Sequence, residues 1–118
     1  MRNSIIRAII LSAIIPLNSF AQLTGWEVVQ SSTTQNLNSI YFYNHQVGVA
    51  CGDSGVVLRS IDSGKTWQSL QSPVTFNLND CVLLTEDCFS AVGDSASLIA
   101  TSDGGSTWFS DQILEVVG

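Results

Sequence analysis

The chain of 118 residues contains an internal repeat with a period of about 41 residues, a length typical of one structural repeat unit. Trp26, Trp67 and Trp108 follow one another at this interval, and at that offset residues 26–66 align with residues 67–107 without a gap. Fourteen of the aligned positions are identical. A fixed period decides the architecture before any local prediction is made, because every copy must form the same structural unit. The alignment therefore predicts two copies of one supersecondary unit, stacked in series.

Short β-favouring segments alternate with turn residues within each copy, a pattern that is typical of small antiparallel sheets. The predicted strands are 39–43, 47–51, 56–60 and 66–71 in the first copy, and 80–84, 88–92, 97–101 and 107–111 in the second. No part of residues 22–118 has a sustained helical period. A four-stranded sheet of about 40 residues is the size of one propeller blade. We therefore predict an all-β fold, a partial β-propeller with two four-stranded antiparallel blades at about 38–71 and 79–112.

An Asp-box motif, Ser/Thr-x-Asp-x-Gly-x-Thr-Trp, lies between the third and fourth predicted strands of each copy. Its residues are Ser60, Asp62, Gly64, Thr66 and Trp67 in the first copy, and Thr101, Asp103, Gly105, Thr107 and Trp108 in the second. In such a turn the Asp carboxylate accepts backbone hydrogen bonds, the Gly supplies a positive φ, and the Trp covers the hairpin with a large apolar face. A calcium-binding loop of the EF-hand type would need further carboxylates and a distal Glu, which the motif lacks. We therefore expect these residues to be structural, with no metal and no cofactor.

Three further segments carry a resemblance to a known family: Leu37–Phe42, Gly48–Gly52 and Gly55–Trp67. In this order, a strand, a Gly-rich hairpin and an Asp-box, they resemble one blade of the Asp-box (BNR) repeat propellers of the Ycf48-like group, related to the photosystem II stability and assembly factor. The second copy departs from that pattern at Phe89 and Ala96, which replace Gly48 and Gly55. The resemblance implies a non-enzymatic scaffold that binds a protein partner. The alternative is a non-catalytic piece of a larger secreted sialidase-like glycosidase or cell-surface adhesin.

Two patterns that suggest catalysis have simpler structural interpretations. Residues 52–55, Gly-Asp-Ser-Gly, match the surroundings of the nucleophile in trypsin-like proteases, but Gly-Asp-Ser recurs at residues 93–95. A repeated hairpin turn explains both, and the only histidine, His45, has no counterpart in the second copy. Sialidases bind the substrate carboxylate with an arginine cluster, whereas Arg59 is the only arginine after residue 21. We therefore expect no catalytic residue.

Residues 1–21 resemble a cleaved signal peptide rather than part of a folded domain. Arg2 and Arg7 give a positive start, residues 5–17 are mostly apolar, and Ser19 and Ala21 are small residues at the −3 and −1 positions of a cleavage site. The apolar run is shorter than the roughly 20 residues that a membrane-spanning helix needs. We expect cleavage after Ala21, export to the periplasm, cell surface or medium of a bacterium, and no membrane span in residues 22–118.

Charge and cysteine content limit the partners of the mature chain. After cleavage two basic residues face ten acidic ones, a net charge of −8, which argues against nucleic acid as a partner. Cys51, Cys81 and Cys88 are odd in number, so at least one is unpaired within the chain. Cys81 and Cys88 flank one hairpin without standing directly opposite each other, and we expect all three to act as small buried hydrophobic residues.

Two blades are too few to close a ring, because propellers typically have about four to eight. The segment around Trp26 is either the remnant of a preceding blade or a strand that closes the last one. An open pair of blades would expose apolar side chains. We therefore expect self-association or the remaining blades of a longer chain to cover them, and poor solubility of the isolated monomer.

Overall fold

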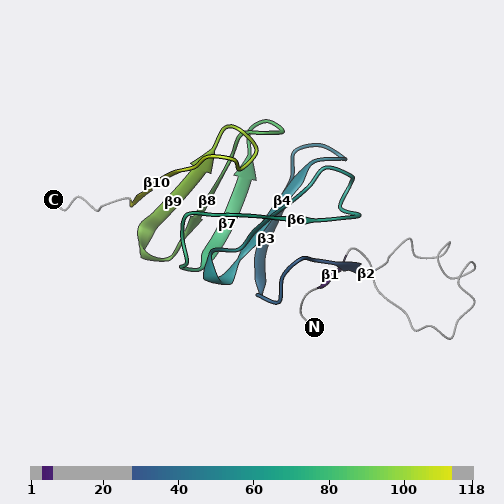
Figure 1. Cartoon of the computed structure of the whole chain (residues 1–118), viewed down its shortest axis with the longest axis horizontal. Helices are drawn as coiled ribbons and strands as arrows, with labels where there is room; N and C mark the ends of the chain where they lie inside the picture. The colour runs from purple at the N-terminus through teal and green to yellow at the C-terminus, as the bar shows by residue number, and fades with distance from the viewer. Residues whose placement is uncertain (1–3, 7–27, 113–118) are drawn as a thin grey trace, which may run out of the picture.

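The computed structural model describes residues 4–6 and 28–112, and residues 37–112 form two four-stranded antiparallel sheets (Figure 1). The first sheet, blade 1, has the order β3-β4-β5-β6, and the second, blade 2, has the order β7-β8-β9-β10. β7 lies against β3 and β4, so the sheets stack face to face. The described residues contain no helix that is long and apolar enough to cross a membrane. The predicted all-β fold with two antiparallel blades is confirmed.

The strands fall close to the predicted positions. Blade 1 consists of β3 (Leu37–Phe42), β4 (Gly48–Gly52), β5 (Val57–Ser60) and β6 (Gln68–Leu70). Blade 2 consists of β7 (Leu78–Leu83), β8 (Phe89–Gly93), β9 (Ser97–Thr101) and β10 (Phe109–Gln112). The fourth strands begin later than predicted, at Gln68 and Phe109, because the backbone N–H of the box threonine binds the Asp carboxylate instead of the neighbouring strand.

Short 3-10 turns join the second and third strands of each blade: η1 (Asp53–Gly55) and η2 (Asp94–Ala96). Gly55 has a φ of 77°, and a Cβ at this position would lie 2.0 Å from the carbonyl oxygen of Val74, in the segment that connects the two blades. Ala96, the equivalent residue in blade 2, also has a positive φ, 53°. The replacement of Gly55 by Ala96 therefore keeps the turn but puts a side chain into a backbone conformation that glycine adopts more easily.

Each blade has two faces, which we name by the box tryptophan. The front face carries that tryptophan, and the back face is the opposite one. The back face of blade 1 packs on the front face of blade 2 in one buried cluster: Val47, Val49, Cys51 and Val57 from blade 1, and Leu78, Cys81, Leu83, Phe89, Ala91 and Ile99 from blade 2. A second cluster lies on the front face of blade 1: Ala50, Leu58 and Trp67, covered by Val29. The core therefore lies mainly between the blades.

A two-stranded antiparallel sheet precedes the blades. It pairs β1 (Ser4–Ile6) with β2 (Val28–Gln30). β1 lies within the segment that we interpret as a signal peptide, whereas Ala21, its cleavage site and Trp26 lie outside the described residues. The signal peptide, its cleavage and the role of Trp26 therefore stay predictions.

Candidate functional site

The Asp-box of blade 1 is a closed hydrogen-bond unit. Asp62 Oδ1 accepts from the Thr66 backbone N–H at 2.9 Å and from Ser60 Oγ at 2.8 Å, and Asp62 Oδ2 accepts from Thr66 Oγ1 at 2.6 Å. Ser60 Oγ in turn accepts from the Gly64 N–H at 2.9 Å, and Trp67 Nε1 donates to the Gly64 carbonyl at 3.0 Å. Every residue that the motif predicts is thus part of one turn.

The box of blade 2 repeats this arrangement almost atom for atom. Asp103 accepts from the Thr107 N–H at 2.9 Å, Thr107 Oγ1 at 2.6 Å and Thr101 Oγ1 at 2.8 Å, and Thr101 Oγ1 accepts from the Gly105 N–H at 3.0 Å. Two bonds differ. The Ser106 N–H donates to Asp103 Oδ1 at 3.1 Å, and the buried indole N–H of Trp108 has no hydrogen-bond partner, whereas that of Trp67 has one.

These hydrogen bonds fix the protonation state of both carboxyl groups. The Thr66 hydroxyl, the Thr66 N–H and then the Ser60 hydroxyl lower the pKa of Asp62 to about 2. The Thr107 hydroxyl, the Thr107 N–H and then the Thr101 hydroxyl lower the pKa of Asp103 to about 2. A carboxylate that stays ionised and fully hydrogen-bonded does not exchange protons near neutral pH. The arrangement organises a turn and offers no general acid or base.

The two box tryptophans contact an aromatic ring from different strands. Trp67 meets Phe42 of β3 edge to face, with ring centroids 5.9 Å apart, and Trp108 meets Phe89 of β8 with centroids 5.7 Å apart. Phe42 lies directly opposite Gly48 in blade 1. In blade 2 the same pair of positions is Leu83 and Phe89. In blade 2 the aromatic ring therefore comes from the second strand instead of the first, and its contact with the tryptophan is kept.

The Gly-Asp-Ser segments are turns, as their repetition indicates. Asp53 accepts from Asn36 Nδ2 at 3.2 Å and Asn38 Nδ2 at 3.0 Å, and Asp94 accepts from Asn79 Nδ2 at 3.0 Å. Ser54 and Ser95 adopt φ values of 59° and 63°. The Asp side chains thus tie the turn to the first strand of the blade or to the residues just before it, which is a structural use of the sequence.

Arg59 connects the two blades, a role that the sequence did not reveal. Its Nη2 donates to the Glu86 carbonyl oxygen at 2.6 Å and to Asp87 Oδ1 at 2.8 Å. The guanidinium group thus binds the β7–β8 hairpin. Among the described residues no group of three or more His, Cys, Asp or Glu side chains has the geometry of a metal site.

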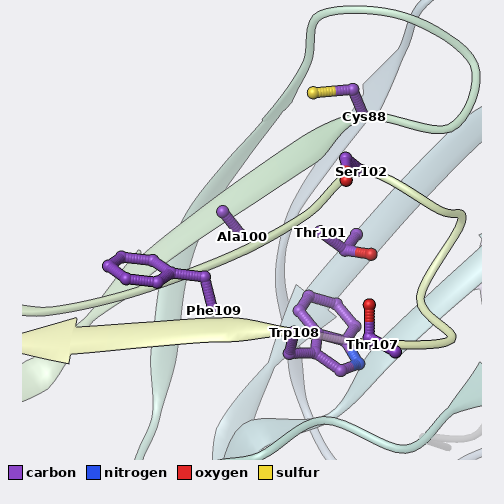
Figure 2. A pocket seen from close by; sticks show the side chains of 7 residues that line it. All are labelled: Cys88, Ala100, Thr101, Ser102, Thr107, Trp108 and Phe109. Atoms are coloured by element: carbon purple, nitrogen blue, oxygen red, sulfur yellow. The ribbon is translucent and has the colours of Figure 1, made fainter.

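An open pocket of about 460 Å³ lies on blade 2 beside its Asp-box (Figure 2). It is lined by Cys88, Ala100, Thr101, Ser102, Thr107, Trp108 and Phe109. Ala100 occupies the position that Arg59 has in blade 1, so a short side chain leaves space where the first copy has a long one. Phe109 is 58% exposed, and Val92, on the same back face, is 40% exposed.

The comparisons with known proteins identify the family. A family model described as "Photosynthesis system II assembly factor YCF48" matches residues 18–110. The chain belongs to this family. A solved structure described as "YCF48 bound to D1 peptide" has a TM-score of 0.64 and 18% sequence identity, and the match covers 72% of this chain and 29% of that one. The chain thus spans less than a third of the YCF48 structure that it matches, and no curated protein matches it. The Ycf48-like resemblance and the partial propeller are confirmed.

Proposed function

We propose that this chain is an exported, non-enzymatic part of a YCF48-family propeller and serves as a scaffold that binds a protein partner. The observation that carries the proposal is the shared fold with a YCF48 structure that is described as bound to a peptide. Because a protein with this fold is described as bound to a peptide, we expect the sheets of this chain to recognise a peptide segment as well.

The Asp-boxes support the non-enzymatic part of this proposal. Asp62 and Asp103 each accept hydrogen bonds on both carboxylate oxygens, and their lowered pKa values keep them ionised. Arg59, the residue that a sialidase-like site would need for a substrate carboxylate, is bound to Asp87. Arg59 and the two box carboxylates are therefore engaged in structural contacts.

The back face of blade 2 supports the binding part. On blade 1 the back-face residues Val49 and Val57 are 0% and 1% exposed beneath blade 2. On blade 2, Val92 and Phe109 remain exposed, and Phe109 lines the pocket. Apolar side chains around a concave site with a few polar groups are the usual composition of a peptide-binding surface. We assign the partner to this face.

A peptide display selection against the immobilised full chain tests the proposal. We expect enriched peptides that lose binding at least about tenfold to Ala100→Arg, because this change restores the long side chain of the first copy and fills the pocket. The matched control is Ile61→Arg, which adds the same charge at a side chain that is 64% exposed and away from the pocket. No enrichment, or equal binding to the Ala100→Arg variant, would refute the scaffold proposal. Hydrolysis of a fluorogenic sialoside above the buffer rate would refute its non-enzymatic part.

Export is tested separately by expressing the full-length chain in a bacterium with a periplasm. We expect the periplasmic fraction to contain a product that begins at Gln22, identified by its intact mass. A product that retains Met1 and stays in the cytoplasm would contradict export.

A further inference from the structure

Cys51 and Cys81 lie on the two sides of the blade interface. Cys51 belongs to β4 on the back face of blade 1, and Cys81 belongs to β7 on the front face of blade 2. The two residues are 0% and 5% exposed and belong to the same buried cluster. The repeat does not require this pair, because the equivalent positions are Val92 and Ile40.

The contacts of Cys81 place its sulfur beside Cys51. Its Sγ lies 3.7 Å from Ser39 Oγ and 3.6 Å from the Val49 carbonyl oxygen. Ser39 is the residue directly opposite Cys51 in the β3–β4 pair. Side chains of such opposed residues have Cβ atoms about 5 Å apart. Val49 precedes Cys51 by two residues and therefore lies on the same face.

We infer that Cys51 and Cys81 are a disulfide site that links the two blades when the chain meets an oxidant of the disulfide class, such as oxidised glutathione. The proposal goes beyond the scaffold function and does not depend on it. Export from the cytoplasm would bring the chain into a compartment where such bonds persist.

The chemistry is a pair of thiol–disulfide exchanges. The Cys81 thiolate attacks one sulfur of glutathione disulfide, which forms a mixed disulfide and releases one glutathione thiolate. The Cys51 thiol then gives up its proton and attacks the Cys81 sulfur, which forms the Cys51–Cys81 bond and releases the second glutathione. Two electrons and two protons leave the protein thiols and appear in two molecules of reduced glutathione.

The surroundings of the two thiols agree with this order of events. Hydrogen bonds with Cys51 and with Ser39 lower the pKa of the Cys81 thiol despite its burial. The same contact between the thiols, together with burial, raises the pKa of Cys51. The contact of Cys81 Sγ with Ser39 Oγ favours the thiolate form of Cys81, and the thiolate is the nucleophile of the exchange. Because both are buried, the first exchange takes place as the blades dock during folding or when the interface opens.

Cys88 does not compete for this bond. Cys81 stands opposite Ala91, and Phe89 stands opposite Leu83, so Cys88 lies beyond the paired part of the hairpin. It lines the pocket on blade 2 and is half-buried. The Cys81 side chain lies on the front face of blade 2, whereas Cys88 borders the pocket beside the Asp-box. A bond between them would require the Cys81 side chain to reach away from the blade interface.

The consequence of the bond is a covalent link between units that otherwise hold together by packing. In stacked repeats each unit contacts only its neighbours, so the interface is where the array separates. The bond closes a loop of roughly 30 residues, long enough for the link to restrict the unfolded chain substantially. Such a link raises the melting temperature by roughly 10 °C or more for a domain of this size.

Peptide mapping after refolding of the full chain in oxidised and reduced glutathione tests the site. Free thiols are blocked with N-ethylmaleimide, and the chain is digested with trypsin and a Glu-specific protease. Trypsin cuts at Arg59 and Lys65 and separates Cys51 from the other two cysteines, and cleavage after Glu86 separates Cys81 from Cys88. We expect one linked peptide pair, Cys51 with Cys81, and a blocked Cys88.

Two variants complete the test. Cys88→Ser should keep the linked pair and the reduction-sensitive melting temperature, and Cys51→Ser should lose both. A Cys51–Cys88 or Cys81–Cys88 link as the main product would overturn the assignment. Two maleimide-reactive thiols in oxidised Cys88→Ser would overturn it as well, whether or not the reduced protein is stably folded.

Discussion

Two residues that stand opposite each other on neighbouring strands should be interchangeable as the source of the aromatic ring that contacts each Asp-box tryptophan. In blade 1 the ring belongs to Phe42 and faces Gly48, whereas in blade 2 the ring is Phe89 and faces Leu83. The perturbation that tests this exchange converts blade 1 to the blade 2 arrangement: Phe42→Leu, Gly48→Phe, and the two combined. The physical claim is that one site beside Trp67 accommodates one ring, whichever strand supplies it.

The structure sets the size of each effect. A Cβ on Gly48 would lie 2.8 Å from the Phe42 ring, so Gly48→Phe alone places two rings in the space of one and costs about 1–3 kcal/mol. Phe42→Leu alone removes the edge-to-face contact with Trp67, which is worth about 0.5–1.5 kcal/mol beyond the loss of buried area. The double variant regains one ring on Trp67. It should be as stable as the parent or slightly more so, because glycine in a strand costs roughly 0.5–1 kcal/mol.

Thermal unfolding, monitored by tryptophan fluorescence and far-UV circular dichroism at one protein concentration, measures the coupling between the two changes. Each single variant should melt about 5–15 °C below the parent, and the double variant within about 5 °C of it. The interaction free energy should favour the double variant by about 1–3 kcal/mol. Simple additivity, with the double variant less stable than either single one, would refute the idea that the two positions share one site.

Three further outcomes follow from the turns. Gly55→Ala should lower the melting temperature more than Gly104→Ala, since the new Cβ would lie 2.0 Å from the Val74 carbonyl oxygen in the first variant and 3.3 Å from Asp87 Oδ1 in the second. Ala96→Gly should raise stability by about 0.5–1 kcal/mol in the same melting assay, because it relieves a positive φ of 53°. The folded-state pKa values of Asp62 and Asp103, about 2, lie below those of the unfolded chain, so their stabilising effect is present above about pH 4 and is lost as the pH falls to about 2. The double Asp→Asn variant should therefore show a weaker decline of melting temperature than the parent between pH 4 and pH 2, and an equal decline would contradict the hydrogen-bond scheme.

The repeat predicted the strands well because each strand is determined within one copy. β5 and β9 were predicted to within one residue, since each contains a short run of consecutive apolar residues between two turns that contain glycine. The fourth strands were predicted to begin too early. Thr66 favours a strand by its chemistry, but its N–H and hydroxyl both bind Asp62, and this bond takes the residue out of the β5–β6 ladder.

The contacts between the blades could not be predicted from the sequence, because they join residues that are not equivalent in the repeat. Arg59 meets Asp87 and Cys81 meets Val49 through the stacking of one copy on the next. A periodic alignment identifies equivalent positions and says nothing of which face meets which. The replacements at Phe89 and Ala96 can be seen in the sequence. Explaining the first needs the register of β7 on β8, and explaining the second needs the path of the segment through Val74.

The two outer faces of the pair differ in how far their central residues are covered. The front face of blade 1 is already covered at its centre, where Leu58 is 0% exposed and Trp67 is 7% exposed beneath Val29. The back face of blade 2 repeats the positions that blade 1 uses to hold blade 2, yet Ser90 and Ala100 replace Val49 and Arg59. A second sheet docked there in the same manner would lack both the valine contact and the arginine clamp. A pocket lies beside Ala100, at the position where blade 1 has the arginine.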